Sequence, residues 1–266
     1  MRLVFASVLF LTTACEVVDS AQATTVIGGL AVATPAVSIQ GQLDVPSEVV
    51  ASAWVSERDN AVSSNLTPID GAIAALIIDD QSLDLPFASD GRYTLTSLDN
   101  GELVYRAGSA YTFTAEVNGA RRGGTVPAAP EQLTPAAIGL SPQPTAAHPS
   151  VPEALLHPAN TALTLSFPAQ YGKYGYVVVL RADPNAPDDP TVVYDSRPQT
   201  AAEVLELIVG DGNRSLQVPA ATFAQDGIYG VIVFAVERGT DLLPNTFIGS
   251  AFLVGSGVAI VVGVDG

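Results

Sequence analysis

Residues 111–117 read YTFTAEV, and this stretch decides the fold class. In an extended chain successive side chains point to opposite faces. The odd-numbered residues of the stretch are aromatic or apolar, whereas the even-numbered residues are threonine and glutamate. Asn118-Gly119, a dipeptide that accepts positive φ angles, follows directly. The sequence therefore predicts a strand with one buried face that ends in a two-residue hairpin turn.

Similar stretches occur in two regions of the chain, separated by turn dipeptides such as Asp90-Gly91. The strand candidates are 37–45, 49–55, 73–78, 93–98 and 111–117 in the first region, and 163–167, 174–180, 191–194, 228–236, 246–254 and 258–264 in the second. Residues 201–208 suit either a strand or a short helix. This pattern predicts an all-β protein with two β-sandwich domains, residues 37–127 and 160–266.

The segment between the two regions is rich in proline. Residues 127–158 contain eight prolines, a density that breaks both helices and ladders and favours an extended spacer. We therefore expect residues 128–159 to be a Pro/Ala-rich linker. His148 and His157, the two histidines of the chain, each precede a proline in this segment and are expected to be linker residues.

The N-terminus has the features of an export signal. An apolar run of nine residues (3–11) follows Met1-Arg2, which is too short to span a bilayer but fits a signal peptide. Thr12-Thr13-Ala14-Cys15 resembles the lipobox of bacterial lipoproteins, although that family usually has Leu where Thr12 stands. The resemblance implies a signal peptide over 1–14 and a palmitate-type lipid on Cys15.

The same resemblance implies a cell-envelope protein attached to a membrane by its N-terminal lipid, with residues 15–36 as a tether. Glu16 takes the place of the Asp that favours inner-membrane retention in some of these lipoproteins, which favours the outer membrane. Ala21-Gln22-Ala23 offers a cleavage site for the alternative, ordinary secretion without a lipid.

Two seven-residue stretches share the pattern F-A-x-D-G-x-Y, residues 87–93 and 223–229. Each predicts a turn at Asp-Gly and a tyrosine that enters the next strand with its hydroxyl bonded to backbone. Residues 160–254 resemble a fibronectin type III or related immunoglobulin-like domain, through 163–168 (LTLSFP) and 229–235 (YGVIVFA), which implies an all-β fold of two immunoglobulin-like β-sandwich domains. Residues 37–127 resemble the prealbumin-like or carboxypeptidase-regulatory-like sandwiches of bacterial lipoproteins, through 90–95, 108–113 and 125–130. Both resemblances imply a fold and no activity.

Net charge and cysteine content argue against a nucleic-acid partner and against a disulfide, respectively. The chain of 266 residues has 27 acidic and 11 basic side chains and a net charge of -16, which argues against nucleic acid as a partner. A single cysteine excludes an intramolecular disulfide.

The residues required for catalysis or metal binding are not grouped in the sequence. There is no G-x-S-x-G motif and no His/Cys cluster, so we expect no catalytic residues, no cofactor and no transition-metal site. Two acidic loops are expected to be solvated turns, with calcium as the alternative; they contain Asp183, Asn185, Asp188 and Asp189, and Asp79, Asp80 and Asp84.

The aromatic residues leave carbohydrate binding open as a second alternative. Trp54, the only tryptophan, lies in an apolar run and is expected in the core. Tyr171, Tyr174 and Tyr176 are expected in strands and turns, with an exposed sugar-stacking patch as the other reading.

The sequence as a whole predicts a lipid-anchored, non-enzymatic binding or structural module whose partner is an unknown envelope protein or glycan. The alternatives are an accessory carbohydrate-binding protein, with or without calcium, and a hydrolase that uses two carboxylates.

Overall fold

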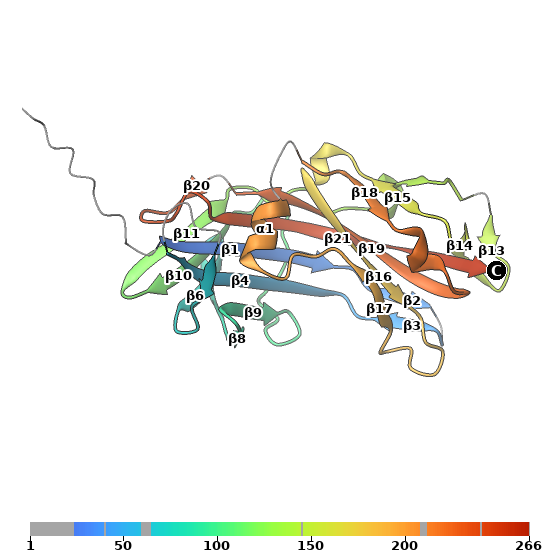
Figure 1. Cartoon of the computed structure of the whole chain (residues 1–266), viewed down its shortest axis with the longest axis horizontal. Helices are drawn as coiled ribbons and strands as arrows, with labels where there is room; N and C mark the ends of the chain where they lie inside the picture. Colours follow the sequence, from blue (N-terminus) through green and yellow to red (C-terminus); the bar gives the residue numbers. More distant parts are fainter. Residues whose placement is uncertain are drawn as a thin grey trace, which may run out of the picture.

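The computed structural model describes residues 24–39, 41–59, 65–144, 146–207, 212–239 and 241–265. The protein is all-β, as predicted, with sheets of eleven, five, three and two strands within these residues. One short α-helix, α1 (Ala201–Leu207), lies among the strands (Figure 1). None of the described helices is long and apolar enough to cross a membrane.

The eleven-stranded sheet, which we call the shared sheet, runs along the whole molecule (Figure 1). Its main path is, in order, β17 (Thr191–Asp195), β16 (Tyr174–Arg181), β19 (Gly227–Arg238), β21 (Ala251–Asp265), β1 (Thr24–Thr34), β4 (Glu48–Arg58), β9 (Arg92–Thr96) and β8 (Phe87–Ser89). Three further strands pair at its margins: β5 (Leu66–Pro68), β13 (Ala147–His148) and β14 (Val151–Pro158).

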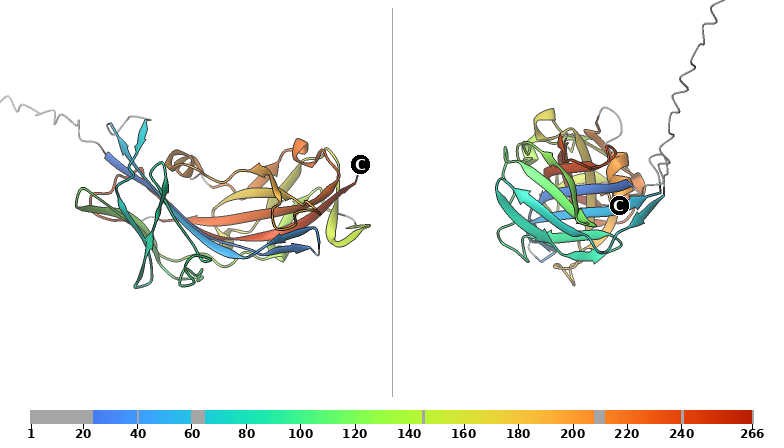
Figure 2. Two further views of the ribbon diagram at one scale, coloured as in Figure 1. Left: turned by 90° about the horizontal axis from the view of Figure 1, so that it is seen from below. Right: turned by 90° about the vertical axis from the view of Figure 1, so that its left-hand side faces the viewer.

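The fifteen-residue strand β21 connects the two halves of the molecule. One edge pairs with β19 from Leu253 to Val264. The other edge pairs in parallel with β1 at its beginning and with β14 at its end. The N-terminal and C-terminal strands are therefore neighbours, and one continuous sheet serves both halves (Figures 1 and 2).

Two smaller sheets pack on the same face of the shared sheet. The first consists of β20 (Asp241–Leu242), β11 (Ala120–Val126), β10 (Tyr111–Val117), β6 (Ile73–Ile78) and β7 (Gln81–Leu85), and the second of β12 (Gly139–Ser141), β15 (Leu163–Ser166) and β18 (Ser215–Val218). Phe252 of β21 belongs to the core beneath the first sheet, and Val258 and Ile260 belong to the core beneath the second. Because all three positions are even-numbered, they share one face of β21, and the two sandwiches lie on the same side.

The opposite face of the shared sheet has its own apolar core. It contains Leu30 and Leu253 together with Phe234 from the C-terminal half. The hairpin of β2 (Val37–Ile39) and β3 (Leu43–Val45) and the side chain of Val204 of α1 pack on this core and cover part of it. This face is only partly covered, and the candidate site lies on it.

The two predicted hairpin turns are confirmed. Asn118 and Gly119 have φ angles of 52° and 74°, and β10 pairs with β11 on either side of them. Asp90 and Gly91 have φ angles of 48° and 69° between β8 and β9. Positive φ at both central positions is the type I′ geometry that matches strand twist.

The tyrosines of the repeated pattern also bond to backbone, as predicted. The Tyr229 hydroxyl donates to the Gln225 carbonyl at 2.6 Å, and the Tyr93 hydroxyl donates to the Ile69 carbonyl at 2.8 Å. Each ring meets the phenylalanine of its own pattern edge-on, with centroid distances of 5.4 Å for Phe223 and 5.6 Å for Phe87.

The expected tether over residues 15–36 is wrong from Thr24 onward, because Thr24–Thr34 forms β1 in the middle of the shared sheet. Residues 25–32 are all buried, so both faces of this strand are apolar or small and the period of two is absent. The signal peptide, Cys15 and residues 16–23 lie outside the described residues.

The expected spacer over residues 128–159 is also wrong, since it contains β12, β13 and β14. The end of β14 pairs in parallel with β21, Leu155 opposite Val262. Pro152 and Pro158 are exposed at this margin of the sheet. Proline is tolerated there because fewer backbone donors are needed than in a central strand. The two sandwiches are therefore joined through a common sheet.

Candidate functional site

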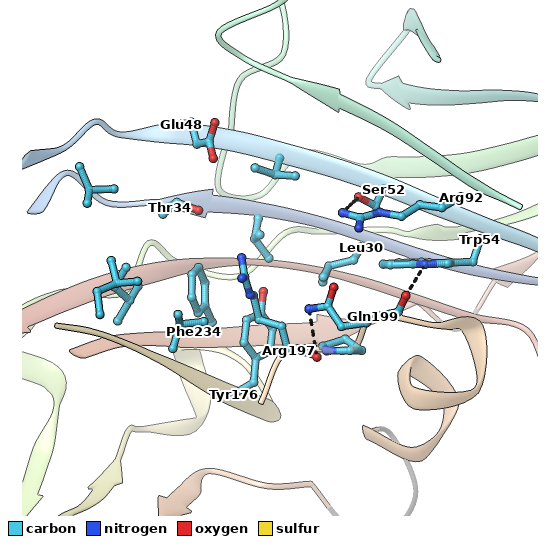
Figure 3. Close-up of a pocket in the computed structure, with 17 residues that line it drawn as sticks. Leu30, Thr34, Glu48, Ser52, Trp54, Arg92, Tyr176, Arg197, Gln199 and Phe234 are labelled. Carbon is cyan, nitrogen blue, oxygen red and sulfur yellow. Dashed lines mark hydrogen bonds between the residues drawn. The ribbon is translucent and has the colours of Figure 1, made fainter. Parts of the chain in front are cut away.

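A groove with a volume of about 330 Å³ lies on the partly covered face of the shared sheet (Figure 3). Its floor is made by side chains of β1, β4, β16 and β19, including Leu30, Val178 and Phe234. One wall is formed by residues 196–200, which connect β17 to α1 and which we call the strap. The groove thus takes residues from both halves of the chain, which the continuous sheet brings together.

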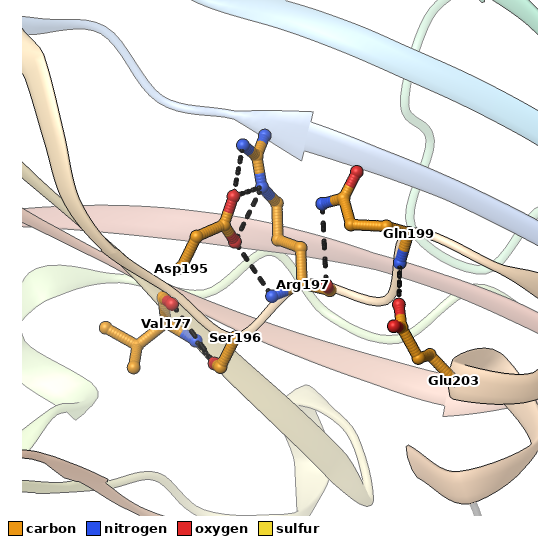
Figure 4. A network of polar contacts seen from close by, with 6 residues as sticks. All are labelled: Val177, Asp195, Ser196, Arg197, Gln199 and Glu203. Atoms are coloured by element: carbon orange, nitrogen blue, oxygen red, sulfur yellow. Dashed lines mark hydrogen bonds and ion pairs between the residues drawn. The ribbon is translucent and has the colours of Figure 1, made fainter.

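The strap is held at several points (Figure 4). Ser196 Oγ accepts the Val177 amide proton at 2.8 Å and donates to the Val177 carbonyl at 3.1 Å. Thr200 Oγ1 accepts the Glu203 amide proton, and the Glu203 carboxylate accepts the amide protons of Gln199 and Thr200. This is a capping box, which fixes the start of α1 and so the end of the strap.

Trp54 joins the strap to the floor. Its indole nitrogen donates to the Gln199 carbonyl at 2.9 Å, and its side chain is buried. The expected core position of Trp54 is therefore confirmed, and the sequence did not indicate that the same ring borders a groove. A second cavity of about 670 Å³ shares Trp54, Arg92 and Gln199 with the groove and extends it beyond the indole.

Two guanidinium groups border the groove. Arg197 of the strap forms a two-point ion pair with Asp195, in which Nη2 lies 2.7 Å from Oδ2 and Nε lies 3.1 Å from Oδ1. Hydrogen bonding to Asp195 raises the pKa of Arg197 further. Because 43% of the Arg197 side chain is exposed, this ion pair is only partly shielded from water.

Arg92 has only neutral partners. Its Nε donates to Thr94 Oγ1 at 3.1 Å and its Nη2 donates to Ser52 Oγ at 3.4 Å. Its guanidinium lies 5.6 Å from the centre of the Trp54 ring. Burial and the charge of Arg197 both lower its pKa. No carboxylate pairs with Arg92 within the part of the chain that the structure describes.

Glu48 is the acidic residue of the groove (Figure 3). Burial and the nearby charge of Asp99 raise the pKa of its carboxyl group, and Arg197 opposes this shift. The groove therefore combines two cations with one carboxylate that ionises less readily than usual.

The Tyr176 hydroxyl is the unsatisfied polar group of the site. Tyr176 is 1% exposed, and its hydroxyl has no hydrogen-bond partner among the described residues. The ring stacks on Phe234 with centroids 4.6 Å apart. Burial raises the pKa of the hydroxyl strongly, which keeps it protonated and able to donate. Leaving such a donor unpaired costs about 1–3 kcal/mol.

The other predicted tyrosines form no exposed platform. Tyr174 and Tyr176 are buried in the same core, whereas Tyr171 is half-buried and packs against the core of the other face. A row of three exposed rings at this position is therefore excluded.

Both histidines are buried anchors, so their expected role as linker residues is wrong. His148 Nε2 lies 2.7 Å from Asp265 Oδ1, and its Nδ1 accepts the Ser150 amide proton at 3.3 Å. His157 Nε2 donates to the Thr161 carbonyl at 2.9 Å. The Ser150 contact is made by backbone, so these groups are not arranged as a nucleophile and its base.

The acidic loops form local contacts. Asp183 Oδ1 accepts the Asn185 amide proton at 2.9 Å, and Asp79 pairs with Arg106 at 3.5 Å. Among the described residues, no three His, Cys, Asp or Glu side chains are grouped so as to hold a metal ion.

The fold and the groove define a class: an all-β protein in which two sandwiches share one sheet and frame a groove of ligand size. No protein-family model matches the chain, and no curated protein matches it. Among solved structures, it is similar to a Ca²⁺-stabilised adhesin with which an Antarctic bacterium binds ice, at 12% identity over 92% of this chain and 50% of that chain, with a TM-score of 0.23.

A second solved structure, of a 1.5-MDa bacterial ice-binding adhesin, is similar at 13% identity over 92% of this chain and 66% of that chain, with a TM-score of 0.20. The chain thus spans one half to two thirds of these structures. TM-scores this low do not carry an argument about function.

Proposed function

We propose that this protein is a non-enzymatic binding module of the bacterial envelope and that the groove is its ligand site. The observation that supports this most directly is the wall of the groove. Capping, indole and serine hydrogen bonds hold the strap over the floor, while the Tyr176 hydroxyl beneath it has no partner among the described residues. A fixed frame around an unsatisfied donor is typical of a site arranged for a ligand.

The contacts of the two histidines support binding over hydrolysis. Both His148 ring nitrogens are engaged, one by Asp265 and one by a backbone amide, and His157 bonds to a carbonyl. Neither ring borders the groove. Glu48 is the only acidic residue among those that line the groove, so the lining residues lack the pair of carboxylates across a cleft that a glycosidase needs.

The proposal includes a lipid on Cys15 and a position in the outer membrane. Two or three acyl chains would make attachment permanent, whereas one chain binds reversibly. Only residues 16–23 separate Cys15 from β1, and eight residues span at most about 29 Å. The folded body would then stay near the headgroups, so envelope glycans or envelope proteins are the partners within reach.

A carbohydrate is the second candidate ligand. The groove and the adjoining cavity share the indole of Trp54 and the amide of Gln199. Aromatic rings beside amide and hydroxyl groups are common in sugar sites. The extension beyond Trp54 offers room for more than one ring.

Trp54 provides the test because it is the only tryptophan and borders the groove. We would titrate the protein with peptidoglycan fragments, lipopolysaccharide oligosaccharides and small organic acids while recording indole emission. A saturating change that persists in the Arg121→Gln variant, whose side chain is exposed on β11, supports the groove as a ligand site. Binding that leaves Trp54 unaffected places the ligand elsewhere.

The anchor is tested separately. Alkyne-palmitate labelling in a bacterial host should mark the wild type and not Cys15→Ser. An unlabelled wild type with a mature N-terminus at Thr24 would instead show ordinary secretion.

A further inference from the structure

We infer that the groove takes a small organic carboxylate: a single carboxylate faces Arg92 and Arg197, and an attached apolar or ring-shaped body lies on the floor. This inference rests on the proposed function and names the class of ligand.

The distribution of charge is the first argument. The chain has a net charge of -16 and only 11 basic residues, so most of its surface repels anions. Two of these few cations nevertheless border one cavity of about 330 Å³. Burial lowers the pKa of Arg92, and the positive charge of Arg197 lowers it further by repulsion. An anion in the groove would relieve that repulsion.

The partners of the two guanidiniums differ, and this difference points to the position of the anion. Asp195 already binds Arg197 through two nitrogen atoms, whereas the partners of Arg92 are the neutral hydroxyls of Ser52 and Thr94. A guanidinium forms its strongest hydrogen bonds with carboxylate or phosphate oxygens. Arg92 is thus the cation that has most to gain from a bound anion.

Tyr176 supplies a third donor. Its hydroxyl is protonated, buried and unpartnered within the described residues, and it lies beside Arg197 at the groove (Figure 3). A carboxylate has several acceptor positions, so it can take protons from a guanidinium and a hydroxyl at once. A protonated hydroxyl that has no acceptor among the described residues fits a ligand that supplies one.

The floor of the groove indicates the chemistry of the part of the ligand that carries the carboxylate. Val178, Ile232 and Phe234 present apolar side chains to the cavity, and the Trp54 ring closes one end. Glu48 disfavours a second negative charge on the ligand, because its carboxylate would repel it. These features argue for one carboxylate with an apolar or ring-shaped body and against phosphates and polyanions.

Isothermal titration calorimetry with matched pairs of probes tests the inference. One pair is 3-phenylpropionate and its neutral amide, 3-phenylpropanamide; the other is glucuronate and glucose. We expect each acid to bind about tenfold or more tightly than its neutral partner, as the loss of a charged hydrogen bond implies. The stronger of the two acids shows whether the body is apolar or a sugar ring.

Three variants assign the effect to the groove. Arg92→Gln and Tyr176→Phe should each weaken binding of the better acid about tenfold and weaken its neutral partner less, because hydrogen bonds to a charged group are the stronger ones. Arg121→Gln removes one exposed positive charge outside the groove and should bind like the wild type. Circular dichroism and a thermal melt of each variant confirm that it is folded.

The outcomes separate the two proposals. If acids and neutral partners bind equally, or if Arg121→Gln weakens binding as much as Arg92→Gln, the carboxylate inference is overturned while the groove remains a ligand site. If none of the four probes binds, the inference is likewise overturned. The glycan titration of Trp54 emission then decides the proposed function independently.

Discussion

The indole nitrogen of Trp54 lies 2.9 Å from the carbonyl oxygen of Gln199, a residue 145 positions further along the chain. This hydrogen bond joins β4 in the N-terminal half to the strap in the C-terminal half. It exists because β1 and β21 pair at the centre of one sheet and bring both halves to the same face. The groove depends on this long-range arrangement.

Replacing Trp54 by Phe should reduce the free energy of unfolding by about 1–3 kcal/mol, because the hydrogen bond is lost and the smaller ring leaves space. Urea denaturation measures this. Phe87→Leu, at an aromatic residue that is 48% exposed, is the control and should change stability much less. Equal losses in the two variants would show that the hydrogen bond between Trp54 and Gln199 adds no measurable stability.

Replacing Tyr176 by Phe should increase the unfolding free energy by about 1 kcal/mol, since it removes a buried donor without a partner among the described residues. Tyr229→Phe is the matched contrast. Its hydroxyl donates to the Gln225 carbonyl at 2.6 Å, so its removal should cost about 1 kcal/mol. Two losses of similar size would mean that Tyr176 is satisfied in the unliganded protein.

Stability should fall as the pH rises above about 10. Burial raises the pKa of Tyr105, Tyr111 and Tyr176 in the folded chain above the ordinary value of 10.0. Between the unfolded and folded pKa values, these tyrosines have lost their protons in the unfolded chain but keep them in the folded chain. The free energy of unfolding therefore decreases as the pH rises through this range.

Unfolding free energies measured from pH 9 to 11 test this prediction, and Tyr176→Phe should show a shallower decline than the wild type. A stability that stays flat or increases over this range would contradict it.

The two halves should unfold together. Residues 37–127 lack β1, so one edge of β4 is unpaired. Residues 160–266 lack β1 and β14, so one edge of β21 is unpaired. Unpaired strand edges and exposed core make each fragment unstable. Calorimetry of the whole chain should therefore give one transition, and neither fragment alone should melt cooperatively. Two separate transitions would favour independent domains.

His148→Ala should loosen the end of the shared sheet. The ring bonds to Asp265 and packs so closely on Gly263 that a Cβ at this position would clash with the ring. Hydrogen exchange of the amides in residues 262–265 should speed up, with a loss of about 1–2 kcal/mol from the broken hydrogen bond and packing. Unchanged exchange in these residues would argue against an anchoring role.

The sequence could predict the strands that have one exposed face. Residues 111–117 alternate because β10 belongs to a sheet with one solvated side. Thr24–Thr34 does not alternate, because both of its faces are buried, so its sequence predicts a tether where the structure has a strand. The prolines of β14 indicate a spacer in the sequence, but a strand at the margin of a sheet tolerates proline.

The groove could not be predicted, because its residues come from distant segments and form no motif. Trp54, Arg92 and Arg197 meet only through the pairing order of the shared sheet and the path of the strap. One local signal was available: Thr200 followed by Glu203 is the capping-box pattern. It could have identified residues 201–207 as a helix and residues 196–200 as the segment leading into it.

The most direct test of the central claim is a crystal structure of the protein with 3-phenylpropionate. We predict electron density in the groove, with the carboxylate within hydrogen-bond distance of Arg92 or Arg197 and the phenyl ring on the floor beside Phe234. Density for the acid elsewhere on the molecule, or in the groove with its carboxylate turned away from both guanidiniums, would contradict the account.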